Sequence, residues 1–153
     1  MNSNLKLLQQ EISKKTASIA NQLLNFTSNY VNTFNQNDIF SFSRKDKQST
    51  ENEKRLEEYY TFLANISPLI TELAALNAKL ASLLIKADIA MDITLITECE
   101  KRFNAFELFE SSSYEYTQSM ELLFSNTSIS ISAIIKSTQK FKNAIDSLIK
   151  ANT

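Results

Sequence analysis

The chain contains no glycine among its 153 residues and only one proline, Pro68. Average usage would supply about ten glycines at this length. Glycine takes a positive φ more readily than any other residue, and primed hairpin turns, phosphate-binding loops and many helix C-caps need such a residue. A chain without glycine therefore has few ways to build tight β-hairpins or a nucleotide-binding loop, and long helices suit it best.

Apolar residues recur at intervals of three and four in four segments, which is the spacing of one face of a helix. The first segment covers residues 5–34 and predicts a helix of about 33 residues. The second begins with a capping-box pattern at Thr50 and Glu53 and continues to residue 87. The other two segments cover residues 96–124 and 131–148.

Pro68 lies inside the second periodic segment. The apolar stripe keeps its phase across the proline, so we expect one kinked helix. The alternative is a new helix with Ser67 as its N-cap and Pro68 at its first position. Asn77 occupies a register position of the same stripe, where it could specify helix pairing or rotate to the edge of the stripe.

The breaks between the segments are polar. Residues 36–49 are charged and aperiodic and predict one longer loop. Residues 87–94 predict a tight turn, because Asp88, Asp92 and Thr94 are good N-cap residues. Residues 128–132 alternate with period two, which is a strand signal, but this run is short and no partner strand is evident.

The pattern predicts an all-α fold in a single domain over residues 1–153. We expect an up-down-up-down four-helix bundle with long, coiled-coil-like helices, because none of these helices can bury its apolar face alone. Five residues from three of the segments are expected to share one core: Leu73, Leu80, Phe106, Phe141 and Ile145.

The composition removes several kinds of chemistry. The chain has no histidine, which is the commonest general base and the usual zinc ligand. Its one cysteine cannot form an intramolecular disulfide or hold an iron–sulfur cluster within one chain. Without glycine there is no P-loop or Rossmann fingerprint. We therefore expect no enzymatic activity, no cofactor and no specifically bound metal.

Two weaker candidates for chemistry lie in the third segment. Glu98, Glu100, Glu107 and Glu110 could form a carboxylate site, since 100/107 and 107/110 have the spacing of one helix face. A solvated acidic face is the preferred interpretation. Cys99 falls on the apolar stripe, and we expect a buried, inert thiol rather than a nucleophile.

The loop at residues 36–49 holds the candidate partner-binding residues Ile39, Phe40 and Phe42. These apolar side chains either cover the open end of the bundle or form an exposed docking patch. The basic residues that follow, Arg44 to Lys47, are interleaved with acidic ones, so nucleic-acid binding is not expected.

The chain has a net charge of −1 and begins without an apolar signal-peptide core. The apolar stretch at residues 66–85 is interrupted by Glu72, Asn77 and Lys79, which we judge too polar for a membrane span. We expect a cytoplasmic protein, and leaderless secretion is left open.

By elimination, we expect a non-catalytic helical protein–protein interaction module, such as an adaptor, chaperone-like, immunity or secretion-associated protein. Long amphipathic helices supply the binding faces that such a role needs. The alternative is a self-associating structural coiled-coil protein, in which case the partner is a second copy in a homodimer. A carboxylate enzyme that uses a divalent metal is the least favoured reading.

Overall fold

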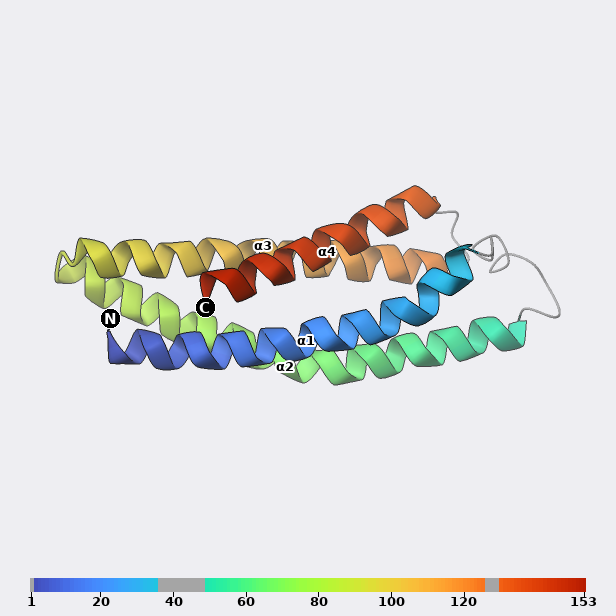
Figure 1. Ribbon diagram of the computed structural model, residues 1–153, viewed down its shortest axis with the longest axis horizontal. Helices are drawn as coiled ribbons and strands as arrows, with labels where there is room; N and C mark the ends of the chain where they lie inside the picture. Colours follow the sequence, from blue (N-terminus) through green and yellow to red (C-terminus); the bar gives the residue numbers. More distant parts are fainter. Residues whose placement is uncertain (1, 36–48, 126–129) are drawn as a thin grey trace.

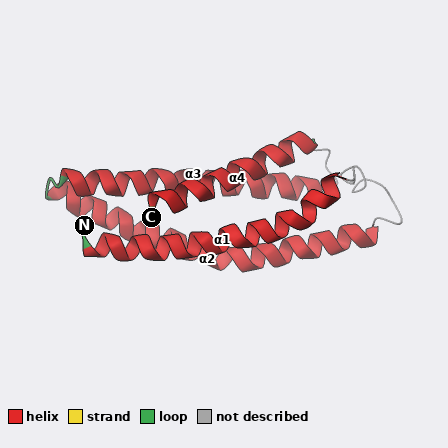
Figure 2. Cartoon of the chain, viewed as in Figure 1, coloured by secondary structure: helices red, strands yellow, loops and turns green. Residues whose placement is uncertain are grey.

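A computed structural model describes residues 2–35, 49–125 and 130–153. It contains four α-helices: α1 (Ser3–Asn35), α2 (Ser49–Ile89), α3 (Ile93–Phe124) and α4 (Ile131–Ala151). The described residues contain no strand (Figure 2). The prediction of an all-α chain with four helices is therefore confirmed. The predicted loop lies outside the described residues except for Ser49, which begins α2.

Two of the long helices, α2 and α3, continue through the positions at which the sequence weakens them. α2 is unbroken at Pro68, so the alternative of a new helix that starts at Ser67 is wrong. Pro68 has no N–H to donate, but Ile66 and Leu73 on either side of it are buried and hold the helix against the core. α3 likewise continues through its serine-rich middle, where the small side chain of Ser112 is buried.

The helices lie side by side along the long axis of the molecule (Figure 1). α1 and α3 run in one direction, and α2 and α4 run back. α1 packs against α2 and α4, and α3 packs against the same two helices. α4 has only 21 residues, whereas α2 has 41. The C-terminus of α4 lies part-way along the molecule. The end that carries the α2–α3 turn is therefore built by α1, α2 and α3 alone.

The main core contains aromatic side chains from all four helices. Phe26 of α1 stacks on Phe62 of α2, with 4.7 Å between the ring centroids. Tyr116 of α3 lies 5.3 Å from Phe141 of α4, and the edge-on contact of Phe62 with Tyr116 at 6.4 Å joins the two pairs. Such ring pairs contribute about 0.5–1.5 kcal/mol beyond their area burial, so these contacts hold the helices together across the core.

A second, smaller cluster lies at the three-helix end. It consists of Leu5, Leu80, Leu83 and Cys99, and it contains no residue of α4. Leu73, Phe106, Phe141 and Ile145 share the main core as predicted, but the prediction for Leu80 is wrong. Leu80 is buried about 10 Å further along α2 than Leu73, and it packs in this second cluster.

The buried face of α2 differs from the predicted stripe. The spacing of three and four places Leu63, Ile70 and Leu84 on one stripe with Leu73 and Leu80, but Leu63, Ile70 and Leu84 are only half-buried. Three neighbours that the stripe omitted are buried instead: Phe62, Leu76 and Leu83. α2 contacts α1 on one side and α3 on the other, so its buried face is wider than a single stripe and centred differently.

One stretch of α2 is apolar enough to cross a membrane by length and composition. It lies within Glu53–Ile89 and has a mean hydropathy of 1.4. The stretch meets this criterion despite its polar interruptions, and the expectation that the chain does not span a membrane stays a prediction. Only 22% of the stretch is buried inside the structure, so α2 presents more apolar surface than its neighbouring helices cover.

Candidate functional site

The sites predicted from the sequence do not converge in the structure. Ile39, Phe40 and Phe42 lie outside the described residues, so their role as a docking patch stays a prediction. Of the four candidate glutamates in α3, Glu100, Glu107 and Glu110 are exposed, whereas Glu98 is held by Arg102. Across residues 2–35, 49–125 and 130–153, no three potential metal ligands of the His, Cys, Asp or Glu types lie together.

Arg102 is the most deeply buried charged side chain among the described residues, with 3% of its surface exposed. Its Nη1 donates to the backbone oxygen of Glu98 at 2.7 Å and to the Glu98 carboxylate at 2.8 Å. This hydrogen bond and the guanidinium charge lower the pKa of the Glu98 carboxyl. Sequence reasoning missed Arg102, although it lies three residues after Cys99 and four before Phe106, in phase with the buried face.

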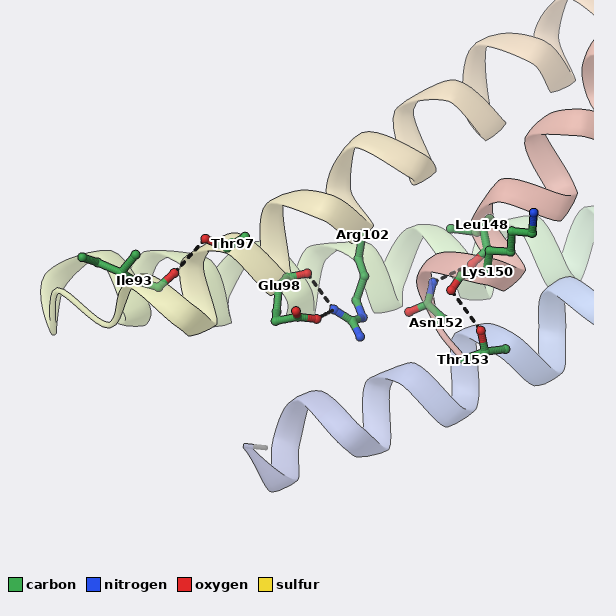
Figure 3. A network of polar contacts seen from close by, with 8 residues as sticks. All are labelled: Ile93, Thr97, Glu98, Arg102, Leu148, Lys150, Asn152 and Thr153. Atoms are coloured by element: carbon green, nitrogen blue, oxygen red, sulfur yellow. Dashed lines mark hydrogen bonds and ion pairs between the residues drawn. The ribbon is translucent and has the colours of Figure 1, made fainter.

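Arg102 lies close to the C-terminal end of α4 (Figure 3). There the side-chain amide of Asn152 donates to the carbonyl of Leu148 at 2.8 Å and closes the last turn. The Nε of Arg102 and the Oδ1 of Asn152 are both buried without a hydrogen-bond partner among the described residues. Both polar groups belong to side chains with 3% of their surface exposed.

Two other polar candidates from the sequence, Cys99 and Asn77, lie at least partly inside the packed helices. Cys99 is fully buried, and burial raises the pKa of its thiol, so the nucleophilic thiolate form is disfavoured. Asn77 is half-buried, and its side-chain oxygen is buried without a partner among the described residues. Half burial places Asn77 at the edge of the buried face, as the second of the two sequence interpretations expects.

The described surface carries one concentration of large exposed apolar residues around a single turn. Ile85 is 62% exposed, Ile89 79%, Met91 81% and Ile93 76%. We call these four residues the α2–α3 corner. They surround the tight turn that the sequence predicted at residues 87–94, at the tip of the three-helix end (Figure 1).

Backbone hydrogen bonds fix the conformation of the α2–α3 corner. The N–H of Asp92 donates to the carbonyl of Ala87 at 3.0 Å, and that of Met91 donates to Asp88 at 3.1 Å. These two bonds form a Schellman C-cap, which requires a left-handed residue that is usually glycine. Here Met91 takes that role with φ 56°. Asp92 then caps α3, because its carboxylate accepts from the N–H of Leu95 at 3.2 Å.

The apolar side chains of the corner are bordered by charge. Lys86 and Asp88 lie in the last turn of α2, and Asp92 caps the start of α3. An apolar centre with a polar rim is the arrangement found in protein–protein interfaces. The sequence held one signal for this surface: Ile85 and Ile89 fall off the apolar stripe of α2, and they lie just before and within the predicted turn.

Comparison of the chain with protein-family models, with characterised proteins and with solved structures gives no match. The function is therefore inferred from the residues of this chain alone.

Proposed function

We propose that the protein is a non-catalytic helical interaction module that binds another protein through the α2–α3 corner. Its scaffold would be an up-down-up-down four-helix bundle with coiled-coil-like packing. The observation that carries the proposal is the exposure of Ile89, Met91 and Ile93 on a turn whose backbone is held in one conformation.

Exposed apolar side chains clustered at one place favour a binding role. Single exposed apolar residues are normal on protein surfaces, but contiguous apolar patches of a few hundred Å² mark interaction sites. The corner brings four such residues into nine positions of the chain. Because the turn is already ordered, a partner would lose little conformational entropy in binding it.

The loop residues Ile39, Phe40 and Phe42 give a second candidate surface for the same function. The described helix ends that flank this loop, Asn35 and Ser49, lie at the end of the molecule opposite to the corner (Figure 1). The two candidate surfaces can therefore be tested independently by separate pairs of substitutions.

The test compares affinity capture of the native partner by three forms of the full chain, with the captured proteins identified by mass spectrometry. Ile89→Ser with Ile93→Ser removes the apolar corner. Leu24→Ser with Leu108→Ser is the matched control, because these leucines are 57% and 50% exposed elsewhere on the surface. We expect the corner variant to lose a partner that the wild type and the control variant both retain.

Three results would contradict the proposal. Capture by the corner variant that equals the wild type would show that the corner is not the binding surface. A dimer at micromolar concentration that the corner substitutions dissociate would support the self-associating alternative instead. Binding to neutral phospholipid vesicles that depends on Ile89 and Ile93 would assign the corner to a membrane surface.

A further inference from the structure

A groove of about 370 Å³ opens between the start of α1 and the end of α2, close to the α2–α3 corner. We call it the α1–α2 groove. Leu83 forms its buried floor, Leu8 is half-buried beside it, and Leu7 is 62% exposed at the rim. The remaining lining residues are polar: Asn4, Lys79, Ser82 and Lys86.

The charged side chains that line the α1–α2 groove are all basic. Lys79 and Lys86 line it, and no lining residue is acidic. Neither lysine forms an ion pair or a side-chain hydrogen bond with any residue that the structure describes. Lys15, on the facing side of α1, differs: it donates to the carboxylate of Glu72 at 2.8 Å and joins α1 to α2. The groove therefore presents two cations that are not neutralised locally.

The two lysines have a defined spacing. They are seven residues apart on one face of α2, which places their Cα atoms about 10.5 Å apart along the helix axis. Ile89 lies three residues beyond Lys86 and seven beyond Ser82, so the same face of α2 leads from the groove into the α2–α3 corner. The groove and the corner thus form one continuous surface.

We propose that the α1–α2 groove receives an acidic amphipathic helix of the partner protein. The apolar face of that helix would cover Leu7, Leu8 and Leu83, in the manner of helix-in-groove recognition. Two carboxylates seven residues apart on a helix have the same separation as Lys79 and Lys86, so both ion pairs form in one register. This inference depends on the proposed function, because it describes the partner that the interaction module binds.

The groove is poorly suited to a second copy of this chain. The exposed acidic pair with the matching spacing is Glu100 and Glu107 of α3. Between these two glutamates the same face of α3 carries the polar residue Asn104, and its exposed apolar residues Ile93 and Tyr114 lie seven residues outside the pair. Leu83, which lies between the two lysines of the groove, would therefore have no apolar partner. A helix of a separate partner can carry leucines between its two carboxylates. Such a helix would match both the lysines and the apolar floor of the groove.

The experiment measures binding of two stapled helical peptides to the full chain by fluorescence anisotropy. Each peptide has about 15 residues, the length at which a helix becomes stable alone, and carries leucines on one face. One has two glutamates seven residues apart, and the other has lysines at the same two positions. The protein variants are Lys79→Glu with Lys86→Glu and the matched control Lys14→Glu with Lys101→Glu, which changes two exposed lysines outside the groove.

We expect the acidic peptide to bind the wild type and the control variant with similar affinity. The groove variant should bind it at least about tenfold more weakly and should now bind the basic peptide, because the charge complementarity is reversed. Leu7→Ser should also weaken binding of the acidic peptide, since it removes part of the apolar surface. Circular dichroism of each variant shows whether it remains folded.

The inference is overturned if the acidic peptide fails to bind the wild type, or binds the groove and control variants equally. It is also overturned if the wild type forms a dimer that only the groove substitutions dissociate. Loss of the native partner by the corner variant but not by the groove variant would leave the proposed function standing and contradict this inference. Retention of that partner by the corner variant would contradict the proposed function whatever the peptides do.

Discussion

The two regions of the molecule are packed differently. In the main core, aromatic rings from all four helices contact one another, and Tyr59, Phe109 and Phe141 are almost completely buried. At the three-helix end the core contains only Leu5, Leu80, Leu83 and Cys99, and large apolar residues lie outside it in solvent. The comparison indicates that the four-helix region supplies most of the stability, which leaves the three-helix end free to present an apolar surface.

The largest expected effect is in the main core. Phe141→Ala should lower the free energy of unfolding by about 3–5 kcal/mol, because it removes a fully buried ring and leaves a cavity. Phe141 also contacts the rings of Phe109 and Tyr116. Urea denaturation followed by circular dichroism measures the change. A loss below about 1 kcal/mol would show that α4 does not close this core.

Leu80→Ala should cost about 2–3 kcal/mol, less than Phe141→Ala, since the second cluster is smaller and can relax toward solvent. The same denaturation experiment provides the comparison. If Leu80→Ala destabilised the protein more than Phe141→Ala, the three-helix end would be the more important core, and the contrast between the regions would be reversed.

Glu98→Gln should cost about 1–2 kcal/mol at neutral pH, because it removes the negative charge that faces the buried guanidinium of Arg102 and leaves only neutral oxygens as acceptors. The expected loss of stability is modest, because the Glu98 side chain is 37% exposed and solvent partly screens its interaction with Arg102. Arg102 lowers the pKa of Glu98 in the folded protein. The stabilisation is therefore present above the unfolded pKa of about 4.3 and is lost as the pH falls through the folded pKa.

Thermal unfolding of the wild type and of Glu98→Gln between pH 3 and pH 7 tests this linkage. The two proteins should differ at pH 7 and converge as the pH drops below about 4. A difference in stability that is independent of pH would mean that the carboxylate charge does not stabilise Arg102.

Met91→Gly should raise the free energy of unfolding by about 0.5–1 kcal/mol. A residue other than glycine at positive φ costs about 1–2 kcal/mol, and the greater freedom of glycine in the unfolded chain offsets part of the gain. Met91 has φ 56° and is exposed, so little packing is lost. Met91→Ala is the control and should stay close to the wild type. Equal stability of the glycine and alanine variants would argue against a strained turn.

The smallest effect on stability is expected at the α2–α3 corner. Ile89→Ser with Ile93→Ser should change the free energy of unfolding by less than about 0.5 kcal/mol per site, because both side chains are largely exposed. Urea denaturation measures it. A loss of several kcal/mol would show that these residues support the fold, and the corner would no longer be a free surface.

Much of the fold could be predicted from the sequence. Spacing of three and four predicted four helices close to their observed bounds, and Asp92 was recognised as an N-cap. The phase of each helix also separates close pairs of tyrosines: Tyr59 and Tyr116 are buried, whereas Tyr60 and Tyr114 are exposed. These features depend on interactions within one helix or one turn, which neighbouring residues specify.

The candidate site could not be predicted in the same way. Ile89 and Ile93 are ordinary core residue types, and only the place where α4 ends and the direction of the turn leave them in solvent. Arg102 is the opposite case, since a charged residue type is buried, with 3% of its surface exposed. The spacing of apolar residues shows which face of a helix is apolar. It does not specify how many neighbouring helices cover each part of that face.

The sequence by itself determined that the chain is helical, because it lacks glycine and repeats its apolar residues with the period of a helix. The absence of glycine also forced a residue with a Cβ atom into the left-handed position of the turn, although not which one. Only the tertiary structure decided that Met91 takes that position, that Leu80 and Phe141 lie in separate cores, and that the corner stays exposed. The physical reason is that helix formation depends on local hydrogen bonds and side-chain spacing, whereas burial depends on the lengths and positions of helices that are distant in the sequence.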